Sequence, residues 1–338
     1  MMSLYSGNFQ KILVIQTASI GDVILATPVI EKLHANYPGA QIDFLLKEGF
    51  EDLLGGHPYV RAILSWNKNE SKYTNLYNLL EFIRSERYDV VINLQRFLST
   101  GILTAFSGAK VKLGFKKNPL SFLFTKSFKH KIGEKYGNVH EIDRNLALTS
   151  FIKDNKRYRP GLYPGKKAEA RISQYKTRSY ITISPASIWY TKQFPEKKWM
   201  AFLDKIPRDF NVFFLGAKED KELSERIIKA SSHPHVMDLC GKLSLLESAS
   251  LIADAHMNFA NDSAAQHLAS AMNAPITTIY CSTVPEFGFG PLSDDSAVIE
   301  TDEDLYCRPC GLHGYNKCPE GHFKCADIDI EKLLNRLD

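Results

Sequence analysis

The sequence contains no apolar run long enough to cross a membrane. None approaches the roughly 20 consecutive apolar residues that a bilayer-spanning helix needs. Near the N-terminus, the apolar run Ile12–Ile15 follows Lys11, but it is too short for the hydrophobic region of a signal peptide and is typical of a strand. Without a secretory signal, the 6 cysteines are not expected to form a disulfide framework. These absences predict a cytoplasmic protein.

The chain also lacks a strong excess of charge. Its 42 basic and 38 acidic residues leave a net charge of +4, which by itself does not indicate nucleic-acid binding. The charge is uneven, because Glu134 is the only acid between Lys110 and Lys135. Such a run is either a solvated face or a surface for an anionic partner. Its lysines are Lys110, Lys112, Lys116, Lys117, Lys126, Lys129, Lys131 and Lys135.

The common phosphate-binding motifs are missing as well. The turn after the first apolar run has one glycine, Gly21, so it lacks the G-x-G-x-x-G fingerprint of dinucleotide-binding proteins, and no P-loop follows it. No D-x-D pair stands at the turns where a metal-dependent sugar-nucleotide site would need it. If the protein binds a diphosphate, we expect fixed cations and backbone N–H groups to neutralise its charge.

What the sequence does contain is a regular alternation of short apolar runs and amphipathic segments. Strands alternating with helices indicate βαβ units and a parallel sheet. A chain of 338 residues is long for one core, and two domains are expected. We predict an α/β protein with domains at 1–160 and 179–338, joined by a Pro/Gly-rich linker at 161–178. The closing amphipathic helix, 328–337, is a candidate to pack back toward the first domain.

The predicted elements leave three polar turns at the carboxyl ends of strands. The predicted strands and helices are 11–16, 23–37, 41–46, 50–54, 62–66, 75–87, 89–94, 98–106, 112–115 and 140–152 in the first half, and 168–174, 180–184, 196–206, 211–215, 219–231, 236–239, 245–253, 257–260, 263–272 and 275–280 in the second. The turns are Thr17–Asp22, Ser184–Lys192 and Asn261–Ser263. Ligands of open α/β sheets bind at such ends, so we expect a central cleft lined by turns from both domains.

Each turn offers a chemical role and a structural alternative. Asp22 is able to accept a proton from an attacking hydroxyl, or it simply caps a helix. Lys192 is able to neutralise a diphosphate, although most lysines have no specific role. The small residues after Asp262 expose helix N–H groups that suit a phosphate, with Asp262 and His267 beside them for the phosphate or sugar hydroxyls. The alternative is a capping box from Ser263 to Gln266, or a cap by Asp262.

Three motifs in order resemble glycosyltransferase family 9, the ADP-heptose:lipopolysaccharide heptosyltransferases. Gly21-Asp22-x-x-Leu25-x-Thr27-Pro28 resembles the G-D-x-x-x-x-T-P signature of the family. Ser184-Pro185-Ala186-Ser187, followed by Lys192-x-Phe194-Pro195 and Trp199, is similar to its P-G-A…K-R-W-P segment. Asn261-Asp262-Ser263-Ala264-Ala265-Gln266-His267 is similar to its N-D-S-G-P-x-H, with Ala264-Ala265 in place of Gly-Pro.

The resemblance implies a GT-B fold of two Rossmann-like domains, with the acceptor in the first and the nucleotide sugar in the second. It implies an inverting, metal-independent transferase that requires no cofactor, with ADP-heptose as donor and a lipopolysaccharide inner-core sugar as acceptor. Such a protein works at the inner face of the cytoplasmic membrane. The matching positions make Asp22 the general base. The donor-binding residues are Ser187, Lys192, Asp262, Ser263, Ala264 and His267.

The sequence also supports other interpretations of the cysteines and of the function. The cysteines Cys307, Cys310, Cys318 and Cys325 resemble a cluster near the C-terminus of some family members, and they either bind a structural metal or are reduced thiols that pack a loop. The alternative functions are another nucleotide-sugar enzyme of this fold, with a different donor or with epimerase activity, and a sugar-nucleotide-binding protein without turnover. Asp22 argues against a pure binding protein, which needs no base.

Overall fold

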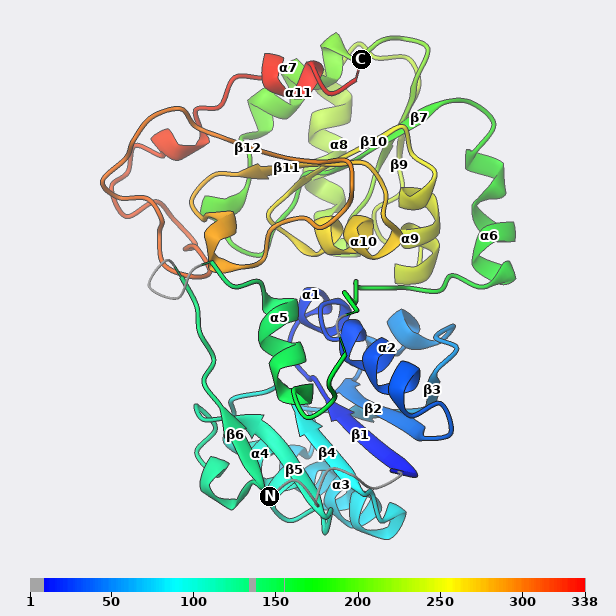
Figure 1. The fold of residues 1–338 in the computed structure, drawn as a ribbon. Coiled ribbons are helices and arrows are strands. Elements are labelled where there is room, and N and C mark those ends of the chain that lie inside the picture. Colours follow the sequence, from blue (N-terminus) through cyan, green and yellow to red (C-terminus); the bar gives the residue numbers. More distant parts are fainter. Residues whose placement is uncertain (1–8, 134–137, 155, 338) are drawn as a thin grey trace. The chain divides into compact units, whose positions relative to one another are not determined.

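Two compact units, residues 1–163 and 164–338, make up the computed structural model, which describes residues 9–133, 138–154 and 156–337 (Figure 1). Each unit contains a six-stranded sheet in which all neighbouring strands are parallel. This confirms the predicted α/β class with two Rossmann-like, doubly wound sheets. In the described parts of the chain, no helix combines the length and hydropathy that crossing a bilayer requires.

The first sheet has the strand order β3-β2-β1-β4-β5-β6. Its strands are β1 (Lys11–Ile15), β2 (Gln41–Lys47), β3 (Val60–Trp66), β4 (Val90–Asn93), β5 (Val111–Phe115) and β6 (Lys126–Phe128). The helices of this unit are α1 (Ile20–Ile24), α2 (Thr27–Asn36), α3 (Lys72–Glu86), α4 (Leu98–Ala105) and α5 (Glu141–Leu146), with 3₁₀ turns at Glu51–Leu54, Ser121–Leu123 and Ala147–Thr149. Leu76 and Ile83 of α3 and Leu103 of α4 pack on one face of the sheet.

The second sheet repeats this plan in the order β12-β11-β10-β7-β8-β9. Its strands are β7 (Tyr180–Ser184), β8 (Asn211–Phe214), β9 (Val236–Asp238), β10 (Met257–Asn261), β11 (Ile276–Tyr280) and β12 (Ser296–Glu300). The helices are α6 (Lys166–Ile172), α7 (Glu196–Lys205), α8 (Lys221–Ala230), α9 (Leu245–Ala253), α10 (Ala264–Met272) and α11 (Glu331–Leu334). Short 3₁₀ turns lie at Ser173–Tyr175, Tyr190–Lys192, Lys218–Asp220, Pro285–Phe287 and Lys324–Ala326.

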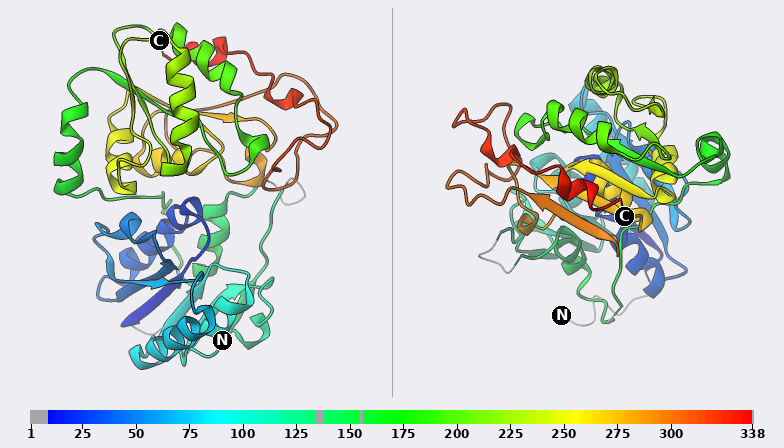
Figure 2. Two further views of the ribbon diagram at one scale, coloured as in Figure 1. Left: turned by 180° about the vertical axis from the view of Figure 1, so that it is seen from behind. Right: turned by 90° about the horizontal axis from the view of Figure 1, so that it is seen from above.

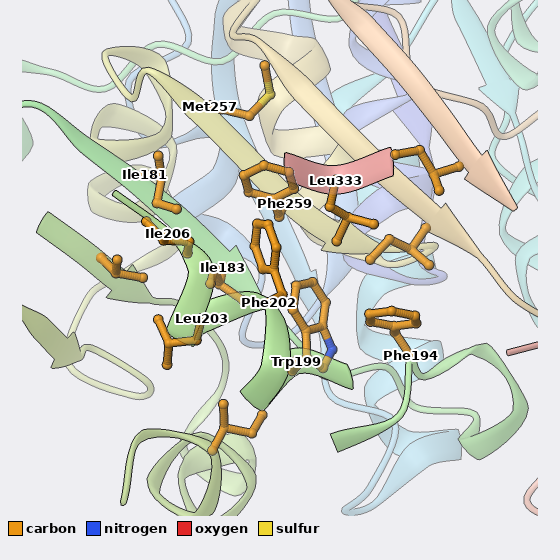
Figure 3. Close-up of a cluster of buried hydrophobic side chains, with 14 of the residues drawn as sticks. Ile181, Ile183, Phe194, Trp199, Phe202, Leu203, Ile206, Met257, Phe259 and Leu333 are labelled. Carbon is orange, nitrogen blue, oxygen red and sulfur yellow. The ribbon is translucent and has the colours of Figure 1, made fainter. Parts of the chain in front are cut away.

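The core of the second unit anchors the turn that carries Lys192. Trp199, Phe202 and Leu203 of α7 are fully buried against β7 and β10. Figure 3 shows Phe202 against Phe259, with ring centroids 4.8 Å apart, and Trp199 edge-on to Phe194 at 5.3 Å. Each side chain of this size contributes about 1.5–3 kcal/mol by burial. Because Phe194 and α7 directly follow Lys192, the backbone after the lysine is held rigidly.

Alternate residues of β7 face opposite layers of helices, as expected for a strand buried on both sides. Ile181 and Ile183 contact the cluster that includes α7 and α8. On the other face, the Tyr180 hydroxyl donates to the carbonyl of Leu251 in α9 at 2.8 Å. The two further views show helices on both faces of the sheet (Figure 2).

One predicted helix, 23–37, is in fact two. Pro28 has no N–H to donate to the carbonyl of Ile24, and its ring crowds that carbonyl, so α1 ends there. The Thr27 hydroxyl donates to the Ile24 carbonyl at 2.7 Å in place of the missing N–H. It also accepts a hydrogen bond from the backbone N–H of Gly161 at 3.0 Å. Pro28 therefore opens α2 instead of bending one long helix.

Other boundaries also differ from the prediction. No strand was predicted between the elements at 112–115 and 140–152, where the edge strand β6 lies, and β12 was not predicted at all. Within the expected linker 161–178, the predicted helix 168–174 is confirmed as α6, which begins two residues earlier and belongs to the second unit. The last helix is only α11, and its Leu333 is buried in the core of the second unit.

Candidate functional site

The predicted donor residues lie where the strand order of the second sheet reverses. β7 and β10 are neighbours, while β8 and β9 continue on one side and β11 and β12 on the other. The turn after β7 carries Ser187 and Lys192, and the turn after β10 carries Asp262 and Ser263. In doubly wound sheets this reversal point is the usual place for a ligand. The first sheet has the same order, with its reversal between β1 and β4.

Lys192 and Asp262 form an ion pair at this point. The Lys192 ammonium lies 2.6 Å from Oδ2 of Asp262, and both side chains are largely buried. Two further groups hold the carboxylate: the Thr283 hydroxyl donates to Oδ2 at 2.6 Å, and the Gln266 amide donates to Oδ1 at 2.9 Å. The carboxylate is therefore fixed on both oxygens, and it orients the lysine.

Sequence reasoning missed Thr283 and the role of Gln266. Thr283 comes three positions after β11 ends, at the same sheet edge as Asp262. That position was the only signal available. Gln266 is fully buried and also accepts a hydrogen bond from the Tyr280 hydroxyl at 3.1 Å.

The start of α10 lacks the side-chain cap, by Ser263 and Gln266 or by Asp262, that was the alternative to phosphate binding. Ser263 is the N-cap residue, with extended backbone angles, and its side chain makes no capping hydrogen bond. Gln266 turns toward Asp262, so the Ser263–Gln266 capping box is wrong, and Asp262 is not the cap either. Ser263 and Ala264 are partly exposed, whereas His267 is buried one turn further along. The first turn thus presents small side chains at the positive end of the helix.

A buried asparagine ties the two turns of the second unit together. Oδ1 of Asn261, the last residue of β10, accepts from the backbone N–H of Phe194 at 3.0 Å, and its amide donates to the carbonyl of Pro185 at 2.5 Å. Ser187 lies half-buried on the turn between them, and its carbonyl accepts from the side chain of Gln193 at 2.6 Å. The Ser187–Lys192 segment is therefore bracketed by contacts to β10.

The cysteine-rich loop, which carries Cys307, Cys310, Cys318 and Cys325, also contacts the turn that carries Lys192. The Thr191 N–H donates to the carbonyl of Tyr315 at 3.0 Å, and the Tyr315 N–H donates to the Thr191 hydroxyl at 2.8 Å. Gly314 has φ +77°, and a Cβ there would lie 2.8 Å from that hydroxyl oxygen. Only glycine allows this close approach without a shift. The loop thus packs directly beside Lys192, a contact that the sequence did not reveal.

The four cysteines of this loop line one cavity of about 260 Å³. All carry free thiols. Burial raises the pKa of Cys325 to about 11 and also raises the pKa of Cys310, so these thiols are protonated at neutral pH. Among the described residues, no group of three or more His, Cys, Asp or Glu side chains is arranged to hold a metal ion. Elemental analysis of the purified protein tests whether these cysteines hold a structural metal.

In the first unit, Asp22 occupies the predicted turn after β1. It is the third residue of α1 and closes a capping box with Ser19. The Ser19 backbone N–H and hydroxyl donate to Oδ2 of Asp22 at 3.1 and 2.6 Å, and the Asp22 N–H donates to the Ser19 hydroxyl at 3.3 Å. The N-cap residue is therefore Ser19 and not Asp22, which takes part in the cap from the third helical position. A cap also fixes the carboxylate in one orientation, which a general base requires.

The basic segment of the first unit is largely exposed. Lys116, Lys117, Lys129 and Lys131 are exposed, whereas Glu134 and Lys135 lie outside the described residues. Most of the phenylalanines among these lysines pack inward: Phe115 and Phe124 are buried and Phe128 is half-buried. Phe122 is the exception, with 77% of its surface exposed.

The comparison with known families identifies the fold and its chemistry. The sequence profile of Glycosyltransferase family 9 (heptosyltransferase) matches residues 76–314. The chain belongs to glycosyltransferase family 9. This confirms the family that the three motifs indicated, and the protein is a glycosyltransferase.

Individual relatives agree with this assignment. The chain is 29% identical over 279 residues to "Lipopolysaccharide heptosyltransferase 3" of Escherichia coli, covering 78% of this chain and 81% of that protein. Among solved structures, E. coli ADP-heptose lps heptosyltransferase II has a TM-score of 0.80 at 22% identity and 97% coverage of both chains. E. coli heptosyltransferase WaaC with ADP-2-deoxy-2-fluoro heptose has a TM-score of 0.72 at 19% identity, covering 97% of this chain and 100% of that one.

Proposed function

We propose that this family 9 glycosyltransferase transfers heptose from ADP-heptose to a lipopolysaccharide inner-core acceptor, with inversion and without a metal cofactor. The observation that carries the proposal is the Lys192–Asp262 pair beside the first turn of α10. A fixed cation and a helix N-terminus at one sheet edge suit a diphosphate leaving group. The names of the relatives, which include a complex with an ADP-heptose analogue, support the choice of donor.

The residues of the second unit have complementary roles in this proposal. Lys192 and the N–H groups from Ser263 and Ala264 bind the diphosphate, and Ser187 assists from the neighbouring turn. His267, which is buried in α10, is assigned to the sugar or the phosphate of the donor. Asp262 is held by Thr283 and Gln266, so it acts on the donor chiefly by aiming Lys192.

Asp22 of the first unit is the proposed general base. The acceptor hydroxyl oxygen forms a bond to the anomeric carbon of heptose as the bond from that carbon to the diphosphate breaks. The hydroxyl proton passes to the Asp22 carboxylate, and ADP leaves with the bonding electron pair. Attack from the face opposite the leaving group inverts the anomeric centre.

The test is product formation with purified components. The protein is incubated with ADP-heptose and a defined inner-core acceptor, and mass spectrometry follows the gain of one heptosyl unit. A thermal-shift series with ADP-, UDP- and GDP-sugars runs in parallel, and we expect the largest stabilisation with ADP-heptose. Stronger stabilisation by a UDP- or GDP-sugar would contradict ADP-heptose as the donor. Binding of ADP-heptose without transfer would indicate a sugar-nucleotide-binding protein and not an enzyme.

We further propose that the lysines of the basic segment hold the enzyme at the cytoplasmic face of the inner membrane. Exposed lysines attract anionic lipid surfaces by about 1 kcal/mol each when close, and the attraction fades within a Debye length. A lipopolysaccharide acceptor is itself anionic and lies in such a surface. The exposed Phe122 lies between Lys117 and Lys126 in the sequence.

Reversing Lys116, Lys117, Lys129 and Lys131 to glutamate is expected to weaken binding to anionic vesicles and to raise the acceptor KM, with ADP-heptose affinity unchanged. Sedimentation with vesicles at increasing salt measures the first effect, and steady-state kinetics the second. A matched control reverses four exposed lysines of the second unit, Lys166, Lys167, Lys197 and Lys229. The control variant has the same net charge as the first variant. Equal losses of vesicle binding in the two variants, or vesicle binding that does not depend on salt, would indicate that the basic segment is only a solvated face.

A further inference from the structure

A lysine far away in the sequence reaches the turn that carries Asp22. Lys68 lies in the loop between β3 and α3, and its Nζ donates to the carbonyl oxygen of Thr17 at 2.5 Å and to the Thr17 hydroxyl at 3.0 Å. Thr17 is 1% exposed. It stands two positions before Ser19, which holds Oδ2 of Asp22. The Lys68 ammonium thus binds the backbone of the turn that leads to Asp22, the proposed base.

The surroundings of Lys68 disfavour its charge. Burial, together with the positive charges of Lys47 at the end of β2 and Lys72 at the start of α3, lowers the pKa of Lys68 to about 8. The Trp66 ring, whose centroid lies 5.0 Å from Nζ, partly compensates through a cation–π contact. A lysine without a local task would extend into water and keep its ordinary pKa. Here the ammonium stays half-buried, bound to Thr17.

We propose that Lys68 is a positioning residue for glycosyl transfer: its ammonium fixes the Thr17–Ser19 turn and, through Ser19, the carboxylate of Asp22. This inference rests on the proposed role of Asp22 as base. A charged donor makes a hydrogen bond roughly twice as strong as a neutral one, so loss of the proton loosens the turn without removing the side chain. A general base must lie within hydrogen-bond reach of the proton it takes. A displacement of about 1 Å costs roughly 100-fold in rate.

The expected pH dependence follows from the direction of the pKa change. Lys68 is charged below its pKa and neutral above it, so the contact has full strength on the acidic side and weakens as pH rises through about 8. The charged groups facing it are Lys47 and Lys72, and Asp22 is the titratable group on the turn itself. Lys68 sets the alkaline limb.

The experiment compares the pH dependence of kcat for the full-length wild type, Lys68→Arg and Lys68→Met at saturating donor and acceptor. Because arginine stays charged throughout this range, Lys68→Arg should retain activity where the wild type declines, so its alkaline limb should disappear. Lys68→Met should lose roughly 10- to 100-fold in kcat at pH 7. The KM for ADP-heptose should stay within about twofold of wild type, because the proposed donor residues belong to the other unit.

Lys72→Met provides a control with a directional result. It removes a like charge without touching Thr17, so it should keep kcat near wild type at pH 7 and move the alkaline limb to higher pH. A purely structural role for Lys68 predicts no such shift. Superimposable alkaline limbs in wild type, Lys68→Arg and Lys72→Met would overturn the inference, as would wild-type kcat in Lys68→Met. A wild type that makes no heptosylated product overturns the proposed function instead, and that result appears before any variant is made.

Discussion

Replacing Asp22 by asparagine is expected to lower kcat by roughly 10²- to 10⁴-fold, while ADP-heptose affinity stays close to wild type. A sugar hydroxyl is a weak nucleophile, and an amide cannot take its proton in the transition state. Asparagine keeps the size of the side chain and an oxygen acceptor for the Ser19 contacts. Single-turnover kinetics measure the transfer step, and calorimetric titration measures donor binding.

The capping box complicates this prediction, because loss of a cap alone costs about 1 kcal/mol of stability. The second unit contains a matched control. Glu247 closes a capping box with Ser244 at the start of α9, and its Oε2 accepts from the Ser244 N–H at 2.9 Å. Glu247→Gln should show a similar small loss of stability with wild-type kcat. Equal kcat in Asp22→Asn and Glu247→Gln would reduce Asp22 to a helix cap.

The capping box also illustrates which features a sequence reveals. Ser19 and Asp22 are three residues apart, and their contact depends only on the local backbone. The strand β1 is equally local: its five residues are almost all apolar and buried, which is typical of a central parallel strand. Such features could be predicted because no distant residue decides them.

Features set by distant residues were not predictable. β6 has only three residues, begins with Lys126, and is a strand because its backbone pairs with β5 at the edge of the sheet. β12 likewise depends on pairing with β11. Neither has the apolar run of a central strand, since an edge strand leaves one side to solvent.

The site shows the same division between local and distant contacts. The motifs placed Lys192 and Asp262 on turns at one sheet edge, because the carboxyl ends of parallel strands meet there. The contacts themselves join distant residues. Lys192 and Asp262 are 70 positions apart, and Thr283 and Asp262 are 21 apart. Lys68 and Thr17 are 51 positions apart. Spacing along one sequence carries no signal for such pairs. Only the folded chain shows that Asp262 faces the lysine.

Replacing Lys192 by alanine is expected to weaken ADP binding by roughly 10- to 100-fold and to slow transfer in the same variant. A hydrogen bond to a charged group is worth about 1.5–3 kcal/mol, and Lys192 is the cation proposed to meet the diphosphate. Adenosine, which has no phosphate, should lose much less affinity. Calorimetric titration with ADP and adenosine measures both, and equal losses would indicate that the lysine only maintains the fold.

The ion pair makes stability a necessary part of this test. Removing Lys192 leaves the Asp262 carboxylate largely buried without its cation, and breaking such a pair costs about 3–5 kcal/mol. Lys192→Ala/Asp262→Asn removes both charges, so it should regain much of the thermal stability lost in Lys192→Ala. It should not regain ADP affinity, because the cation is still missing. Recovery of ADP binding in the double variant would mean that the single variant failed through misfolding.

Two further measurements complete the argument for a fixed cation in place of a metal. Lys198→Ala removes another paired lysine of the second unit, which lies 2.6 Å from Asp327, and it should leave ADP affinity unchanged. Transfer by the wild type should persist in EDTA, since Lys192 and the helix N–H groups are proposed to carry the charge of the leaving diphosphate. Activity that EDTA abolishes and Mg²⁺ restores would assign that charge to a metal and would leave Lys192 with a supporting role.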